Sequence, residues 1–230
     1  MSAALFGLIP AAGSGARLGA ELPKQYLPIG GEAMLIHALR ALLQISEIQT
    51  VFVVLAPDDA HFRSLDLGTQ AGRVAPLYCG GKTRRDSVRN GLIAATDAIE
   101  PEDWVLVHDA ARPCLGRGEL EALIEQVRHE QVGGLLAVPL ADTLKRGDEA
   151  ERVADTPARE GLWLAQTPQM FRYADLLRAL DVAPAATDES SAIESLGLKP
   201  RLVRGSNSNL KITYAGDLAI AEALLKKEKK

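Results

Sequence analysis

The sequence predicts an α/β protein built on a doubly wound, mostly parallel sheet. Short apolar runs recur along the chain, and amphipathic helical patterns lie between them. Runs that are apolar at nearly every position suit strands that are buried on both faces, as in a parallel sheet. The expected strands are residues 5–10, 50–55, 104–108 and 134–138, with a further extended segment at 201–203.

Apolar residues at helical spacing predict the helices that cover this sheet. In residues 33–43, for example, Leu35, Leu39 and Leu42 share one face. Because strands alternate with helices, ligands are expected outside the carboxyl ends of the strands. The expected helices are 33–43, 87–99, 119–132, 173–180, 188–196 and 214–227.

A polar segment interrupts this alternation after Pro139. Residues 141–160 are rich in charge and too long for an ordinary loop, so they predict either a disordered stretch or a projecting arm. Gly147-Asp148 could turn a hairpin within it. We therefore expect a single domain over residues 1–230, with a β-arm at about 141–160.

Composition excludes several classes of function. The 26 Lys and Arg residues against 30 Asp and Glu give a net charge of −4, which does not favour non-specific nucleic-acid binding. No apolar run approaches the ~20 residues that a membrane span needs. Two cysteines cannot build a disulfide framework, which fits the reducing cytoplasm. We expect a cytoplasmic protein that binds neither nucleic acid nor membranes.

A loop with several glycines follows the first expected strand. Gly13-x-Gly15 lacks the spacing of the dinucleotide fingerprint, since Gly19 comes one residue late. Gly81-Lys82-Thr83 resembles the end of a P-loop, but Pro76 stands where the first glycine of that motif belongs. From the glycines alone, the loop is either a phosphate-binding turn of another kind or simply a tight turn.

Two cations follow these glycines, Arg17 within the loop and Lys24 just after Pro23. A guanidinium group can bind two phosphate oxygens, whereas an ammonium group supplies a compact charge. Nucleotidyl transfer depends on such positioning and charge neutralisation. The pair therefore predicts a triphosphate clamp, and two ordinary surface cations are the alternative.

Seven motifs along the chain belong together. The first two are residues 10–27 and 107–113, and the third combines Gly80-Gly81 with Arg84, Asp86 and Ser87. The remaining four are 142–145, 166–169, 187–189 and 210–213, although Asp188-Glu189 could instead cap the helix that follows Thr187. In these motifs the chain resembles the family of 2-C-methyl-D-erythritol 4-phosphate cytidylyltransferases, and residues 10–27 match the signature of that family.

The resemblance implies an enzyme of the non-mevalonate isoprenoid pathway that condenses CTP with 2-C-methyl-D-erythritol 4-phosphate. The products would be 4-diphosphocytidyl-2-C-methyl-D-erythritol and pyrophosphate. The resemblance also implies Mg²⁺ as the cofactor, held mostly by phosphate oxygens and water. Two alternatives stay open: a cytidylyltransferase for another polyol phosphate, such as ribitol 5-phosphate, and a catalytically silent nucleotide-binding regulator.

Individual roles also follow from the resemblance. Arg17 and Lys24 would stabilise the transition state on the triphosphate. Arg159 and Lys211 would position the sugar phosphate, which Thr143 would also contact, and Asp109 would lie near the ribose and the metal. The other substrate-binding residues that it implies are Ala11, Ala12, Gly13, Gly15, Gly81 and Ser87.

The arm at 141–160 carries Arg159, yet it is too polar to pack on its own domain. The commonest soluble assembly is a two-fold dimer, in which each chain contributes the same element. We therefore expect a homodimer with shared active sites. Arg17, Lys24 and Lys211 would come from one chain, and Arg159 from the other.

Overall fold

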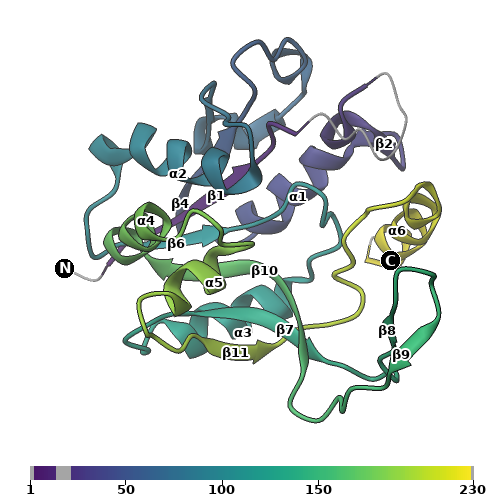
Figure 1. The fold of residues 1–230 in the computed structure, drawn as a ribbon. Helices are drawn as coiled ribbons and strands as arrows, with labels where there is room; N and C mark the ends of the chain where they lie inside the picture. Colours follow the sequence, from purple (N-terminus) through teal and green to yellow (C-terminus); the bar gives the residue numbers. More distant parts are fainter. Residues whose placement is uncertain (1–2, 14–21, 229–230) are drawn as a thin grey trace.

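The computed structural model describes residues 3–13 and 22–228 (Figure 1). A seven-stranded sheet forms the centre of the fold. Its strands are β1 (Leu5–Pro10), β4 (Ile48–Val54), β5 (Val74–Leu77), β6 (Trp104–Val107), β7 (Gly134–Pro139), β10 (Trp163–Arg172) and β11 (Arg201–Arg204). They lie in the order β11-β7-β10-β6-β1-β4-β5. Neighbouring strands are parallel except where β10 pairs with β6 and β7, so the sheet is mostly parallel, as predicted.

Helices cover both faces of this sheet. The first face carries α1 (Met34–Leu43) and α3 (Arg117–Val127), and the second carries α2 (Arg84–Ala94), α4 (Tyr173–Val182) and α5 (Glu189–Glu194). Alternate strand residues serve the two layers: Leu5 and Ile9 of β1 face the first, and Phe6 and Leu8 face the second. The doubly wound arrangement is therefore confirmed.

The remaining elements lie around this framework. The last helix, α6 (Ala215–Glu228), packs near the short ribbon of β2 (Pro28–Ile29) and β3 (Glu32–Ala33), where Ala221 joins Ile29 in a small apolar cluster. The short 3₁₀ helices are η2 (Lys24–Tyr26), η3 (Phe62–Ser64), η4 (Gly68–Arg73) and η5 (Thr96–Ala98). Within the described ranges, no helix combines the length and the apolar character needed to cross a bilayer.

The structure differs from the expected elements at several points. The helix expected at 87–99 begins earlier, because Thr83 caps α2 by accepting a hydrogen bond from the backbone N of Asp86 at 3.0 Å. It ends at Ala94, and η5 follows. The sequence analysis also missed β5 and β10. The strand β10 contains the buried polar residues Gln166, Thr167 and Gln169, which interrupt the apolar pattern of a central strand.

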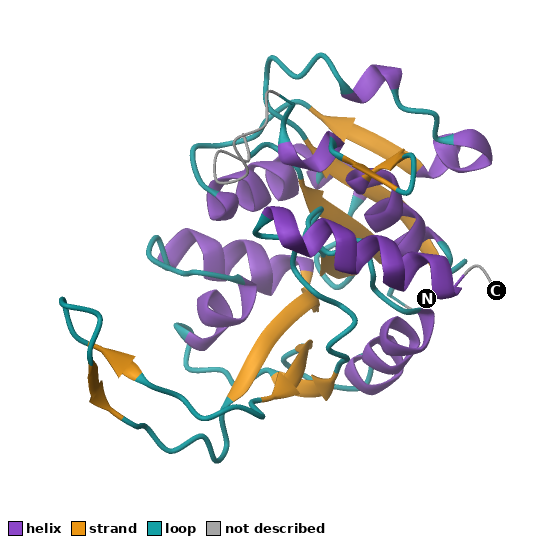
Figure 2. Cartoon of the chain, turned by 90° about the vertical axis from the view of Figure 1, so that its right-hand side faces the viewer, coloured by secondary structure: helices purple, strands orange, loops and turns teal. Residues whose placement is uncertain are grey.

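The polar segment after β7 is a projecting arm rather than a disordered stretch. Figure 2 shows its hairpin, β8 (Arg146–Gly147) paired with β9 (Val153–Asp155), extending away from the body of the protein. The turn begins at Asp148, one residue later than expected, and its Oδ1 accepts backbone hydrogen bonds from Ala150 and Arg152 at 2.9 and 2.8 Å. Val153 on this arm is 64% exposed. The role of the arm in dimerisation stays a prediction.

Gly91 of α2 is required by close packing of this helix on the sheet. A Cβ atom at Gly91 would lie 2.4 Å from Cγ2 of Val54, which is fully buried in β4. Gly91→Ala is therefore expected to lower the free energy of unfolding by about 1–3 kcal/mol through overpacking. Gly118→Ala in α3 is the matched control: no atom lies within 4 Å of its added Cβ, so the helix should gain up to ~1 kcal/mol. Urea denaturation measures both, and two changes of the same sign would contradict this account of the packing.

Candidate active site

A pocket lies where β1 and β6 end. These strands are adjacent and parallel, and the strand order reverses between them, with β4 and β5 on one side and β6 on the other. Such a switch point is where ligands bind in open α/β sheets. The pocket encloses about 190 Å³ and is lined by Pro10, Ala11, Gly13, Lys24, Gln25, Met34, Arg84, Asp109, Ala110, Ala111 and Lys211.

Asp109 is the carboxylate that lines this pocket. It follows β6 and is buried, and each of its oxygens meets a cation: Oδ1 lies 2.7 Å from Nε of Arg84, and Oδ2 lies 2.7 Å from Nζ of Lys211. Burial alone would raise the pKa of Asp109, but the two cations outweigh it and hold that pKa well below its usual range. Asp109 is therefore ionised at neutral pH.

Two lysines reach the pocket from segments that are far apart in the sequence. Nζ of Lys24, in η2, donates a hydrogen bond to the carbonyl oxygen of Ile212, next to Lys211. The neighbouring Gln25 donates through Nε2 to the carbonyl oxygen of Ala11 at 2.6 Å, which ties η2 to the end of β1. The fold thus brings Lys24 and Lys211 to one pocket, and two ammonium groups together suit a ligand with several phosphates.

The turn at Gly80-Gly81 lies directly against the segment that follows β1. A Cβ atom on Gly80 would lie 2.2 Å from Cβ of Ala12, so glycine is the residue that fits there. Backbone N–H of Gly81 donates to Oγ of Ser87 at 3.0 Å, and Ser87 donates in turn to the carbonyl oxygen of Thr83. The structure therefore brings Ala12, Gly81 and Ser87 together beside the pocket.

The other four predicted site residues are Gly15, Arg17, Thr143 and Arg159. Arg17 and Gly15 lie outside the described residues. Thr143 and Arg159 are described, but they are exposed on the arm and do not line the pocket; Nη1 of Arg159 donates to the carbonyl oxygen of Ala141. Within one chain, the two predicted phosphate contacts on the arm therefore do not line the pocket that contains Lys24 and Lys211.

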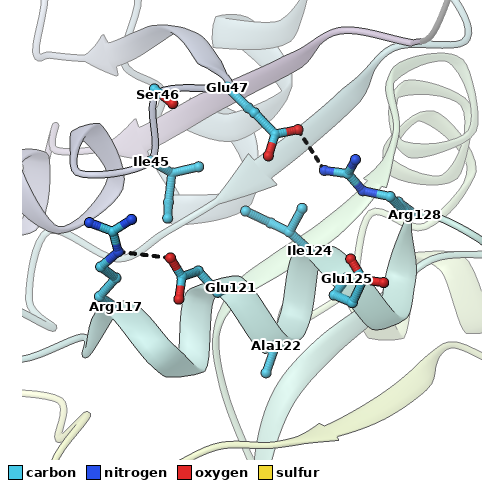
Figure 3. Close-up of a pocket in the computed structure, with 9 residues that line it drawn as sticks. All are labelled: Ile45, Ser46, Glu47, Arg117, Glu121, Ala122, Ile124, Glu125 and Arg128. Atoms are coloured by element: carbon cyan, nitrogen blue, oxygen red, sulfur yellow. Dashed lines mark hydrogen bonds and ion pairs between the residues drawn. The ribbon is translucent and has the colours of Figure 1, made fainter.

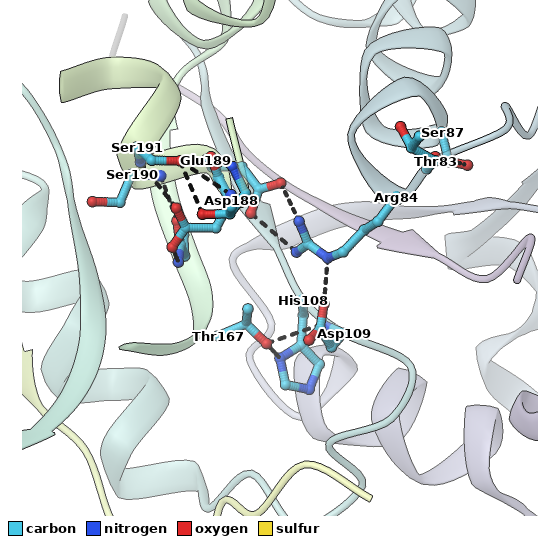
Figure 4. A network of polar contacts seen from close by, with 12 residues as sticks. Thr83, Arg84, Ser87, His108, Asp109, Thr167, Asp188, Glu189, Ser190 and Ser191 are labelled. Atoms are coloured by element: carbon cyan, nitrogen blue, oxygen red, sulfur yellow. Dashed lines mark hydrogen bonds and ion pairs between the residues drawn. The ribbon is translucent and has the colours of Figure 1, made fainter. Parts of the chain in front are cut away.

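A buried polar network lies beneath the pocket (Figure 4). His108 is fully buried, with Nδ1 at 3.0 Å from Oγ1 of Thr167 and Nε2 at 3.0 Å from the carbonyl oxygen of Arg112. Burial lowers the pKa of His108 to about 4, so the ring is neutral at neutral pH. Arg112 donates through Nη1 to the carbonyl oxygen of Asn209 at 2.6 Å, which holds the segment that leads to Lys211.

Sequence reasoning missed the role of Glu189 in this network. Of these two acids, Asp188 is the one that caps α5, accepting a hydrogen bond from the backbone N of Ser191 at 3.0 Å. Glu189 instead points inward and binds Arg84 through both carboxylate oxygens (Figure 4). The motif at 187–189 was the available signal, but the sequence could not show which arginine faces it.

The donor set of the pocket fits a divalent cation that arrives with a nucleotide. Across residues 3–13 and 22–228, no group of three or more His, Cys, Asp and Glu side chains could hold a metal ion by itself. Mg²⁺ usually keeps several waters and takes only one or two carboxylates together with substrate phosphates. Asp109 can supply one such carboxylate, through Oδ2, the oxygen that is paired with Lys211.

A larger hollow of about 450 Å³ lies far from this chemistry, at the amino end of β4 and along α3 (Figure 3). Its arginines already have carboxylate partners: Arg117 lies 2.7 Å from Glu121, and Arg128 lies 2.7 Å from Glu47. Three glutamates, Glu47, Glu121 and Glu125, outnumber the two arginines in this lining, and none of the predicted site residues belongs to it, so the hollow offers little to a phosphate. The smaller pocket at the carboxyl ends of β1 and β6 is therefore the candidate active site.

A mostly parallel sheet with lysines and a buried carboxylate at its switch point defines a nucleotide-binding α/β protein of the nucleotidyltransferase type. The model of the 2-C-methyl-D-erythritol 4-phosphate cytidylyltransferase family matches residues 5–227. The chain belongs to this family. The resemblance given by the seven motifs is thus confirmed.

Individual relatives agree with this assignment. The enzyme of that name from Aromatoleum aromaticum is 54% identical over 220 residues, which cover 96% of this chain and 94% of the relative. The one from Dechloromonas aromatica is 52% identical, covering 97% and 98%. A crystal structure of a 4-diphosphocytidyl-2C-methyl-D-erythritol synthase has a TM-score of 0.86 at 40% identity, covering 98% of this chain and 99% of the other. The Francisella tularensis enzyme has a TM-score of 0.82 at 33% identity, covering 96% and 100%.

Proposed function

We propose that this chain transfers the cytidylyl group of CTP to 2-C-methyl-D-erythritol 4-phosphate, releasing pyrophosphate. The observation that carries the proposal is the meeting of Lys24, Lys211 and ionised Asp109 at the switch point between β1 and β6. Membership of the family supports the choice of substrates.

The chemistry needs positioning more than acids or bases. The phosphate of the alcohol is already an anion at neutral pH, so its oxygen can attack the α-phosphorus of CTP without a general base. A new bond forms between that oxygen and the α-phosphorus, while the bond to the bridging oxygen of pyrophosphate breaks on the opposite side. Repulsion between two polyanions is the main obstacle, and preorganised cations remove it.

We assign the cations by their place in the pocket. Lys24, together with Arg17, would neutralise the triphosphate, and Lys211 would bind the sugar phosphate. Lys211 is paired with Asp109, so an incoming phosphate would compete with this carboxylate for the ammonium group. Mg²⁺, when bound, would add positive charge on the phosphate oxygens, with Asp109 as its protein ligand.

Arg159 and Thr143 would complete the site from a second chain. Both are exposed on the arm, and neither lines the pocket of its own chain. A two-fold dimer in which the arms are exchanged would bring Arg159 of the partner subunit to the sugar phosphate beside Lys211. The exposed apolar side chain of Val153 gives the arm a surface that such a contact could bury.

CTP is expected to be turned over in preference to UTP. The 4-amino group of cytosine is a donor and the 4-oxygen of uracil is an acceptor, so a site built for one leaves the other unpaired at a cost of roughly 1–3 kcal/mol. The turn at Gly80-Gly81, which packs against Ala12, is the candidate reader of the base. We expect kcat/KM for UTP to be lower by about 10–100-fold. Equal values for the two nucleotides would contradict this assignment.

Pyrophosphate release tests the proposed function directly. The enzyme is mixed with CTP and either methylerythritol 4-phosphate or ribitol 5-phosphate, and the two turnover rates are compared. We expect rapid release with the first alcohol and much slower release with the second. Faster turnover of ribitol 5-phosphate would reassign the substrate, and no release with either would favour a silent nucleotide-binding protein.

A further inference from the structure

Glu189 is a buried carboxylate that lies behind the wall of the pocket. Its side chain is only 1% exposed, and Arg84 binds both of its oxygens, at 2.7 Å through Nη1 and 3.0 Å through Nη2. The same guanidinium donates through Nε to Oδ1 of Asp109 at 2.7 Å (Figure 4). Glu189 therefore reaches the pocket through Arg84, which lines it.

The start of α5 is held firmly enough to aim this carboxylate. Gln169 of β10 is 1% exposed and bonds to the two residues that flank Glu189 at the helix start. Its Nε2 donates to Oδ2 of Asp188 at 2.9 Å, and its Oε1 accepts from the backbone N of Ser190 at 2.7 Å. Glu189 lies between these two anchored residues, so a central strand of the sheet fixes its backbone.

Stability alone does not account for a buried pair of this kind. Taking an arginine and a carboxylate out of water costs about as much as their attraction returns, and apolar residues of the same size often stabilise a fold equally well. The orientation of Arg84 and the balance of its charge explain this pair better. Asp109 and Glu189 carry two negative charges and Arg84 and Lys211 carry two positive ones, so the group is neutral as a whole.

We propose that Glu189 is a positioning residue for the active site. It holds Arg84 against Oδ1 of Asp109 and cancels the guanidinium charge. The other oxygen of Asp109, Oδ2, can then exchange between Lys211 and the divalent cation that accompanies CTP. This inference rests on the proposed function, and it concerns a residue that lies outside the lining of the pocket.

The test compares Glu189→Gln with Asp181→Asn, which makes the same change of carboxylate to amide. Asp181 of α4 also pairs with an arginine of α2, at 2.6 Å from Nε of Arg89, but it is 46% exposed and remote from the pocket lining. Calorimetry measures CTP binding, without turnover, over a series of Mg²⁺ concentrations and in EDTA.

Glu189→Gln is expected to raise the Mg²⁺ concentration for half-maximal CTP binding by about ten-fold or more, as for other residues that support a metal ligand. Binding in EDTA should stay the same or tighten, because the pocket has lost a negative charge. Asp181→Asn should leave the half-maximal Mg²⁺ concentration and the CTP affinity in EDTA within about two-fold of the wild type, since exposed ion pairs contribute little free energy. The proposal would be overturned if Glu189→Gln bound CTP like the control, or if its CTP binding weakened equally with Mg²⁺ and in EDTA.

A second variant keeps the test decisive if Glu189→Gln folds poorly with an unpaired arginine. Arg84→Met/Glu189→Gln removes the pair together, so the local charge is again neutral. We expect it to fold and to recover most of the Mg²⁺ response, with kcat still lower by about ten-fold because Asp109 has lost its orienting partner. A folded double variant with wild-type kcat would contradict the proposal. If the wild type itself released no pyrophosphate, the proposed function would fail, whereas the binding comparison would still report on Glu189.

Discussion

Lys24→Met is expected to lower kcat by about 10²–10³-fold, the usual loss when one preorganised charge is removed from a transition state. The reason is that the ammonium group would meet charge that builds up as the α-phosphorus becomes five-coordinate, so KM for CTP should change far less. Steady-state kinetics with varied CTP separates the two constants. Arg17→Met is expected to behave in the same way.

Lys226→Met is the matched control for this lysine. Lys226 lies on α6, and its side chain is 71% exposed in an ion pair with Glu222. Its replacement should leave kcat and KM unchanged. The two variants should also unfold at similar temperatures. Equal unfolding temperatures would show that the loss of activity does not come from lower stability after the hydrogen bond from Lys24 to Ile212 is removed. A raised KM with normal kcat in Lys24→Met would show that this residue binds the ground state only.

Arg159→Met is expected to cost about as much as the loss of a pocket lysine, although Arg159 is exposed and absent from the pocket lining of its own chain. The physical reason is that its guanidinium would reach the sugar phosphate in the partner subunit, where no other group replaces it. The rate is measured at saturating CTP with varied methylerythritol phosphate.

Arg152→Met is the control for the arm. Arg152 is also exposed and lies on the same arm, in the turn between β8 and β9. It carries no predicted contact, and its replacement should leave the rate within about two-fold, as is usual for a surface substitution. Equal rates for the two arm variants would remove Arg159 from the active site.

The central strands were predictable because a strand that is buried on both faces is apolar at nearly every position. In β1, Leu5 and Ile9 face one layer of helices and Phe6 and Leu8 face the other, so the whole run is apolar. The strand β10 was missed for the opposite reason. Its buried polar residues are satisfied by partners elsewhere: Thr167 by His108 and Gln169 by Asp188. Such long-range pairs leave no periodic pattern.

The candidate site likewise contains some residues that the sequence could predict and others that it could not. Residues that belong to local motifs, such as Lys24, Asp109 and Lys211, could be assigned by resemblance, and the fold brings these three to one pocket. The ion pair between Arg84 and Glu189 could not be predicted, because it joins α2 to α5, and these two residues are 105 positions apart in the sequence. Only the folded chain shows which charges face one another.

Subunit mixing tests most directly whether two chains build each active site. A Lys24→Met chain and an Arg159→Met chain, each nearly inactive alone, are unfolded, mixed in equal amounts and refolded together. Random two-fold pairing makes about half of the dimers mixed, and each mixed dimer has one site with both lesions and one intact site. If the sites are shared, about a quarter of wild-type activity is expected to return. If Arg159 served its own chain, every site in the mixture would carry a lesion, and the absence of any recovered activity would contradict the shared site.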